Sequence, residues 1–280
     1  MKELHQFTDK AELFKHLKEN RDRYIAQKKF SMKCADVVTY NSINHNEAQT
    51  GNIEKGEDAV HDLLLKDSIT VKSVVSTTNL LDSAGDVHIP GLWKKTLKEQ
   101  KNLYLLKEHR MSFEHIISDD VKASTKNMSW KDLGFDYDGE TEALIFDSVI
   151  DKEMNEYMFK KYARGKVKEH SVGMRYVHLN LCIKSDEKDL REEKENWDKY
   201  IVEVANKEDA EEIGYFWAVT EAKLVEGSAV LKGANWATPT QSVKEYEIEN
   251  YEPPQGTQSN TEPPQGTQKE FFTEFIKLKN

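Results

Sequence analysis

Residues 167–183, VKEHSVGMRYVHLNLCI, alternate between apolar and polar side chains and predict a long β-strand. Residues 214–239, GYFWAVTEAKLVEGSAVLKGANWATP, predict a second long strand that ends in a loop rich in Gly, Asn and Pro. Between them, residues 184–212 carry twelve acidic and six basic side chains. We interpret this block as a solvated helical insertion with an apolar anchor, WDKYIVEV at 197–204. The core is therefore expected to contain two long strands separated by a charged insertion.

Shorter elements are predicted on the N-terminal side of these strands. Short β-branched runs begin at SITVKSVVSTTN, residues 68–79, and Gly and Asp turns separate them. LGFDYDGETEALIFDSVID, residues 133–151, predicts a hairpin that turns at Asp138–Gly139. KEMNEYMFKKYARG, residues 152–165, predicts a helix. Its apolar side and its stop are expected at Met154, Tyr157, Met158, Tyr162 and Gly165.

The chain divides into four parts by composition. Residues 1–66 are predicted to form an extension with a short amphipathic helix around Leu13, Phe14 and Leu17, followed by a strand-like stretch and a polar linker. Residues 67–245 form the predicted core. Residues 246–268 contain the sequence EPPQGTQ two times and predict an extended linker. Residues 269–280 place apolar side chains on one helical face and predict a docking segment.

Charge and cysteine content exclude several classes of protein. The formal net charge of the 280 residues is -10, which argues against nucleic-acid binding and favours protein partners. Cys34 and Cys182 are the only cysteines, so neither a disulfide framework nor a zinc site is indicated. No apolar run reaches the length of a signal peptide or a membrane span. We therefore expect a soluble, unexported protein that does not bind membranes.

Common catalytic motifs are also missing from the sequence. The phosphate-binding patterns G-x-x-x-x-G-K-[ST] and G-x-G-x-x-G are absent, which argues against nucleotide chemistry. H-E-x-x-H and G-x-S-x-G are absent too, so neither a zinc hydrolase nor an α/β-hydrolase is favoured. We expect no cofactor and no metal.

With these motifs absent, the catalytic chemistry that the sequence still allows is a serine nucleophile activated by a base distant in the sequence. A serine hydroxyl needs an imidazole to accept its proton, and a carboxylate commonly orients that imidazole. Ser171, His109 and Glu226 all lie at or near predicted core strands and could meet at one sheet edge. His170 is badly placed as the base because successive strand residues point to opposite faces. Gly173 is expected to let a substrate backbone approach closely.

Each of these residues also has a plainer interpretation. A serine in a strand is more often a filler of the core or an edge. A histidine at a strand exit and a glutamate on a strand are commonly solvated surface residues. His115 and His178 stay open as alternative bases, because spacing rejects neither.

Four segments, taken in chain order, resemble the prohead (procapsid maturation) serine proteases of tailed phages, whose core resembles the herpesvirus assemblins. They are VVSTTNLLDSAGDVHIPGLWKKTLKE (74–99), LLKEHR (105–110), HSVGMRY (170–176) and VEGSAVLKGANWATP (225–239). Together they span about residues 69–240, and several motifs in one order are more specific than any one alone. The segment after His109 lacks the Pro-Ile/Leu-Gly pattern of that family, which keeps His115 open.

The resemblance implies an α+β fold with a mostly antiparallel, barrel-like β-sheet core and flanking helices, similar to the assemblins. It implies a serine endopeptidase in which Ser171 is the nucleophile, His109 the base and Glu226 the third member of the triad. Scaffold protein and major capsid protein would be its substrates, and self-cleavage is an open expectation. Cleavage would occur inside the assembling procapsid in the host cytoplasm. Analogy with the assemblins also allows a homodimer.

Two other functions stay in competition with this one. A noncatalytic capsid assembly or scaffold protein could retain the protease fold with a vestigial Ser171. An esterase or amidase would instead hydrolyse small activated esters and ignore a capsid precursor.

Overall fold

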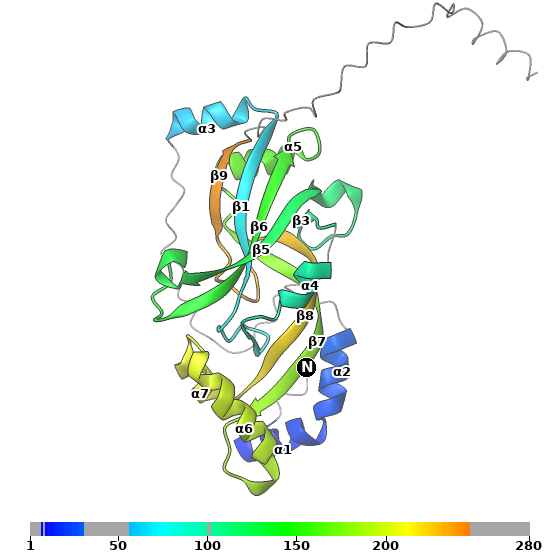
Figure 1. Ribbon diagram of the computed structural model, residues 1–280, viewed down its shortest axis with the longest axis vertical. Coiled ribbons are helices and arrows are strands. Elements are labelled where there is room, and N and C mark those ends of the chain that lie inside the picture. Colours follow the sequence, from blue (N-terminus) through cyan, green and yellow to red (C-terminus); the bar gives the residue numbers. More distant parts are fainter. Residues whose placement is uncertain (1–6, 8, 31–55, 100–101, 247–280) are drawn as a thin grey trace, which may run out of the picture. The chain divides into compact units, whose positions relative to one another are not determined.

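The computed structural model describes residues 7, 9–30, 56–99 and 102–246. The predicted strand-like stretch, residues 29–40, and the polar linker, residues 41–58, lie outside the described residues except at their ends, and there residues 29–30 and 57–58 are helical rather than extended. The Pro/Gln-rich linker and the docking segment lie outside them as well, from residue 247 onward. The fold below is that of the described part of the chain (Figure 1).

The described residues form an α+β fold. Its strands, in chain order, are β1 Ser68–Thr77, β2 Asp86–His88, β3 Leu105–Lys107, β4 Ile116–Ser118, β5 Asp120–Ser129, β6 Glu140–Asp151, β7 Glu169–Ile183, β8 Tyr215–Val230 and β9 Thr240–Glu245. Its α-helices are α1 Lys10–Glu19, α2 Arg21–Phe30, α3 Glu57–Leu64, α4 Lys94–Glu99, α5 Glu156–Ala163, α6 Arg191–Tyr200 and α7 Lys207–Ile213. Short 3₁₀ turns occur at η2 Phe113–His115, η3 Lys131–Leu133, η4 Lys188–Leu190 and η5 Ile201–Glu203.

The two long strands predicted from the sequence, β7 and β8, form an antiparallel pair in a five-stranded sheet, with β8 in its interior and β7 at one edge. On the other edge of β8, β2 pairs in parallel with its first residues and β3 pairs in parallel near its end. β4 adds to β3 in the antiparallel direction. β8 therefore lies between β7 on one side and the end of β3 on the other, which is the arrangement that positions the candidate site.

A second, four-stranded sheet has the order β5-β6-β1-β9 and is antiparallel throughout. Val75 and Phe146 from this sheet belong to the same buried cluster as Val172 and Leu224 from the first. The sheets approach so closely that a Cβ at Gly227 would lie 2.5 Å from the Phe146 ring. The expected barrel-like core is therefore corrected: neither sheet closes on itself, and the core lies between two open sheets.

The N-terminal helices α1 and α2 pack against the core instead of forming a separate extension. Asp9 caps α1 by accepting a hydrogen bond from the Ala11 amide, at 2.9 Å. Phe14, Leu17 and Tyr24 are buried in the same apolar cluster as β7 and β8. Figure 1 shows α2 lying beside β7. The predicted short helix around Leu13 is confirmed, but residues 10–30 are part of the packed unit.

The charged block between β7 and β8 is a helical insertion, as the sequence predicts. It contains α6 and α7, with η4 and η5 at the ends of α6. Trp197, Ile201 and Val204 are buried against Phe216 at the start of β8, so the apolar anchor in WDKYIVEV is confirmed. The charged side chains of α6 largely face solvent, where ion pairs such as Lys194–Asp198 form along the helix.

Two local predictions need correction. Gly139 does lie in a turn with a φ of 86°, but the strand that precedes this turn and pairs with β6 is β5, which ends at Ser129, so residues 130–139 form a longer connection. α5 is shorter than predicted, and Asn155 caps it by accepting from the Met158 amide. Met158 is buried on α5, whereas Tyr157 is 61% exposed.

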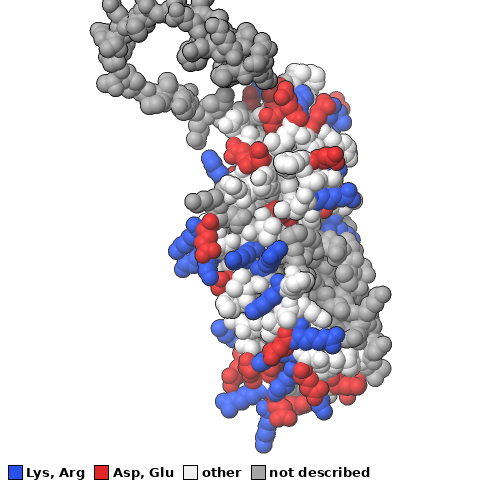
Figure 2. Space-filling model, turned by 90° about the vertical axis from the view of Figure 1, so that its right-hand side faces the viewer, with Lys and Arg blue, Asp and Glu red and all other residues white. Residues whose placement is uncertain are grey.

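Charged side chains of both signs are interspersed on the face of the molecule drawn in Figure 2. Within the described part of the chain, no helix is long and apolar enough to span a bilayer.

Candidate active site

His109 is positioned by an unusual turn at the end of β3. The Glu108 amide donates to the Ala229 carbonyl of β8 at 3.0 Å, which continues the parallel pairing by one residue. Glu108 and His109 then both adopt a φ of 56°, a conformation that side-chain-bearing residues seldom take. This turn reverses the chain at the end of the strand and brings the His109 imidazole onto β8.

The His109 imidazole contacts the Glu226 carboxylate. Nδ1 of His109 lies 2.6 Å from Oε1 of Glu226, and the two side chains are 7% and 0% exposed. Because a carboxylate accepts, Nδ1 carries the shared hydrogen and donates it. Nε2 of His109 is buried and has no hydrogen-bond partner among the described residues. In the neutral ring, that nitrogen holds the lone pair that a general base needs.

Ser228 completes the surroundings of Glu226. Its hydroxyl donates to Oε2 of Glu226 at 2.6 Å and accepts from the His109 amide at 3.0 Å. Ser228 is not among the residues predicted from the sequence. The available signal was its position two residues after Glu226, since alternate residues of a strand share a face.

Gly173 makes room for the carboxylate. It lies opposite Glu226 in the register of β7 and β8, where the pairing shifts by one residue and leaves Val225 as a bulge. A Cβ on Gly173 would lie 1.9 Å from Oε1 of Glu226. The expectation that a substrate backbone uses this space is therefore wrong, because the Glu226 side chain occupies it.

Ser171 lies directly opposite Ser228 in the same register. The intervening pair, Val172 and Gly227, faces the four-stranded sheet, so Ser171 and Ser228 lie on the other face. Directly paired residues of antiparallel strands hold their Cβ atoms about 5 Å apart. The half-buried Ser171 is thus next to the Glu226–Ser228 pair, on the side away from β3. Among the described residues, no hydrogen bond joins Ser171 to His109.

The structure brings two of the three selected residues into contact and places the third one strand away. His109 and Glu226 are hydrogen-bonded although 117 positions separate them in the sequence. Ser171 shares their face of the sheet across β8. The arrangement supplies a carboxylate, an imidazole and a serine in one region.

His170 serves the structure of the opposite face. Its Nδ1 donates to the Thr238 carbonyl at 3.2 Å, which fixes the tautomer, and the Tyr162 hydroxyl donates to its Nε2 at 2.9 Å. Burial lowers the pKa of His170 to about 4, so the ring is neutral at pH 7. The sequence-based exclusion of His170 as the partner of Ser171 agrees with these contacts.

The alternative bases lie elsewhere. His115 is hydrogen-bonded to the Ser112 hydroxyl at 2.6 Å, in the turn that precedes β4. His178 has a side chain that is 67% exposed and lies 3.5 Å from Glu221. Neither has a hydrogen bond or ion pair with Ser171 in the described part of the chain.

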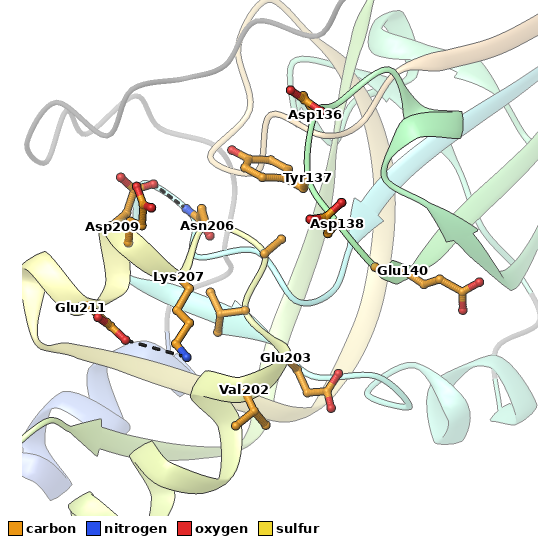
Figure 3. A pocket seen from close by; sticks show the side chains of 14 residues that line it. Asp136, Tyr137, Asp138, Glu140, Val202, Glu203, Asn206, Lys207, Asp209 and Glu211 are labelled. Atoms are coloured by element: carbon orange, nitrogen blue, oxygen red, sulfur yellow. Dashed lines mark hydrogen bonds and ion pairs between the residues drawn. The ribbon is translucent and has the colours of Figure 1, made fainter.

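A cleft of about 930 Å³ lies away from these residues (Figure 3). It is bounded by the connection before β6, residues 136–140, and by residues 202–211 of the insertion. Carboxylates dominate its lining, and Lys207 is paired with Glu211 within it. None of Ser171, His109 and Glu226 lines this cleft.

No protein-family model, curated protein or solved structure matches the chain. Within the described residues, no group of three or more His, Cys, Asp or Glu side chains is arranged to hold a metal ion. The site presents an oriented imidazole, a buried carboxylate and a neighbouring serine.

Proposed function

We propose that the protein is a serine endopeptidase that cleaves scaffold protein and major capsid protein during phage procapsid maturation. The observation that carries this proposal is the 2.6 Å contact between Nδ1 of His109 and Oε1 of Glu226, with Ser171 on the same face across β8. A buried carboxylate that binds Nδ1–H orients the imidazole so that Nε2 can accept a proton, and these are the roles of the two groups in serine hydrolases.

The proposed reaction proceeds through an acyl-enzyme. Nε2 of His109 takes the hydroxyl proton as Ser171 Oγ attacks the peptide carbonyl. The Nδ1–H of the resulting imidazolium stays hydrogen-bonded to the ionised Glu226 carboxylate. The tetrahedral intermediate collapses when His109 returns the proton to the leaving amine. A water molecule, deprotonated in the same way, then hydrolyses the ester and regenerates the Ser171 hydroxyl.

The proposed family rests on the resemblance of four sequence segments to prohead proteases. The segments that resemble prohead proteases form β1, β2, α4, β3, β7 and β8, and they supply all three residues of the proposed triad. An assemblin-like arrangement of the core is part of the proposal. So is the place of action, inside the assembling procapsid in the host cytoplasm, since a protease with such a role must be confined with its substrates.

The test compares the wild-type protein with Ser171→Ala by intact-mass spectrometry, each incubated alone and with the capsid precursor. We expect discrete truncations only with the wild type. Ser148→Ala is the matched control, because Ser148 is a fully buried strand serine outside the site. If Ser171→Ala cleaves the precursor as fast as the wild type, the proposed nucleophile is wrong.

The noncatalytic scaffold function is the second candidate, and one observation favours it: among the described residues, Ser171 has no hydrogen bond to His109. A serine-directed fluorophosphonate separates the two functions. Covalent labelling of the wild type but not of Ser171→Ala supports an active nucleophile. Absence of labelling, together with unchanged capsid maturation in a phage carrying Ser171→Ala, supports the scaffold function.

A further inference from the structure

Ser228 is the polar residue of the site that the proposed reaction does not use. It lies on β8 between the strand that carries Ser171 and the turn that carries His109. Its side chain is fully buried, and both of its hydrogen bonds go to members of the proposed triad. We propose that Ser228 is a positioning residue that locks His109 and Glu226 into the geometry of a general base. This inference rests on the proposed serine-protease function.

The hydroxyl of Ser228 has one defined orientation. It has a single hydrogen, which it donates to Oε2 of Glu226, and it accepts the amide hydrogen of His109 on its oxygen. With Oε2 held by Ser228, Oε1 is the oxygen that faces Nδ1 of His109, at 2.6 Å. One side chain therefore fixes the rotation of the carboxylate and the position of the histidine backbone.

The second contact acts on a strained turn. Glu108 and His109 both have a φ of 56°, and such residues persist where their surroundings hold them. The Glu108 amide is held by the Ala229 carbonyl, and the next amide, that of His109, is held by Ser228 Oγ. Without the hydroxyl, the His109 amide would lose its acceptor, and the turn would be free to relax away from β8.

Ser228 is not a second nucleophile. Its proton is engaged by Glu226 and its oxygen by an amide, and the whole residue is buried, whereas Ser171 opposite it is half-buried. The two serines thus face each other across β7 and β8 with different roles. Ser228→Ala should slow turnover, while a substrate that binds through other contacts should bind as before.

The kinetic test measures cleavage of the capsid precursor by Ser228→Ala, Ser228→Thr and the control Ser148→Ala. We expect Ser228→Ala to lower kcat by about 10- to 100-fold with KM within about twofold, as is common for residues that orient a catalytic group. Ser228→Thr retains the hydroxyl and should restore most of the rate. Equal kcat in Ser228→Ala and the wild type would overturn the proposal.

A spectroscopic test does not depend on proteolysis. In the Ser171→Ala background, the hydrogen between His109 Nδ1 and Glu226 should give a far-downfield proton NMR signal. We expect this signal to be lost or shifted in the double variant with Ser228→Ala and kept with Ser148→Ala. An unchanged signal would contradict positioning by Ser228. If the signal changes as expected but the wild type never cleaves the precursor, the proposed protease function is wrong and the positioning of His109 by Ser228 still stands.

Ser228→Cys covers the case in which the alanine variant does not fold. A thiol is larger than the hydroxyl, so it leaves no cavity at this buried position, and it is a weak hydrogen-bond donor. A folded Ser228→Cys protein should show the same loss of kcat and the same change in the downfield signal. Full activity with an unchanged signal would count against the proposal.

Discussion

Gly173 shows how one missing side chain determines the site. The Glu226 carboxylate fills the space that a β-carbon would take, and it reaches His109 from there. Glu226 and Gly173 are paired across β7 and β8, so neither strand can shift without changing this fit. The geometry of the proposed base depends as much on this glycine as on the charged residues.

We predict that Gly173→Ala displaces Glu226 and inactivates the protein. The new methyl group would lie 1.9 Å from Oε1, so the carboxylate has to move and lose its contact with Nδ1 of His109. Loss of the orienting carboxylate lowers serine-protease turnover by about 10²- to 10⁴-fold. The measurement is kcat for precursor cleavage, beside Glu226→Gln as the reference for a lost carboxylate.

Gly56→Ala is the matched control, because a Cβ there meets nothing within 4 Å. It should leave kcat unchanged. Gly173→Ala with full activity would mean that the carboxylate can act from another position, and the role assigned to its contact with His109 would then be wrong.

At the scale of elements, periodicity predicted what the chain forms locally but not what pairs with it. β7, β8 and the helix around Leu13 are confirmed because each has a clear apolar pattern. The helical insertion is confirmed as well, and its signal was a charged block around the apolar anchor WDKYIVEV. The turn at Gly139 is present, yet a turn signal does not specify its flanking strands, and β6 pairs with β5. The two open sheets depend on long-range packing, such as Phe146 on Gly227, which no local pattern encodes.

The site follows the same rule. The resemblance selected His109 and Glu226, and the structure places them in contact. Ser228 was missed because its only signal is that it shares a strand face with Glu226, two residues away. Gly173 was noticed for the right reason, the space it leaves, but the occupant of that space is a side chain from a neighbouring strand.

The attachment of α2 to the core rests on a buried ion pair. Lys28 of α2 contacts Asp86 at the start of β2, and the side chains are 8% and 0% exposed. Asp86 also accepts from the Tyr176 hydroxyl at 2.7 Å. The pair joins positions 58 residues apart, so the sequence did not reveal that α2 belongs to the core.

We predict that Lys28→Met destabilises the protein by about 3 to 5 kcal/mol, because it leaves a buried carboxylate without its cation. The measurement is the free energy of unfolding from urea titrations of the full chain. Lys29→Met, an exposed neighbour on the same helix, should change it by less than about 0.5 kcal/mol. Equal stabilities for the two variants would show that the ion pair contributes nothing net.

At the scale of the whole molecule, two buried titratable groups make the stability of the fold depend on pH in opposite directions. His170, at the start of β7, has its pKa lowered to about 4 by burial. Asp82, in the turn before β2, has its pKa raised to about 7, by burial first and by the charge of Asp86 second. Their contributions to stability should therefore change with pH in opposite directions.

The direction for each group follows from which state binds the proton more tightly. Between pH 6.5 and 4 the unfolded chain protonates His170 and the folded protein does not, so this contribution is lost as the pH falls, by up to about 3 kcal/mol. For Asp82 the folded protein holds the proton more tightly. Its contribution is therefore full below about pH 4 and is lost as the pH rises to about 7.

We predict that in the wild type the two effects of pH on the free energy of unfolding largely cancel, and that variants lacking one of the two groups show the effect of the other. Asp82→Asn keeps an oxygen for the Ala84 and Asp86 amides and removes one titration, so its free energy of unfolding should fall more steeply than the wild type's between pH 6.5 and 4. His170→Gln removes the other titration and should shift the slope the opposite way. Urea titrations at pH 7, 5.5 and 4 measure all three proteins, and the carboxylates that do not contact the substituted residue cancel in the differences. Parallel curves for the three would show that neither buried group titrates differently in the folded and unfolded protein.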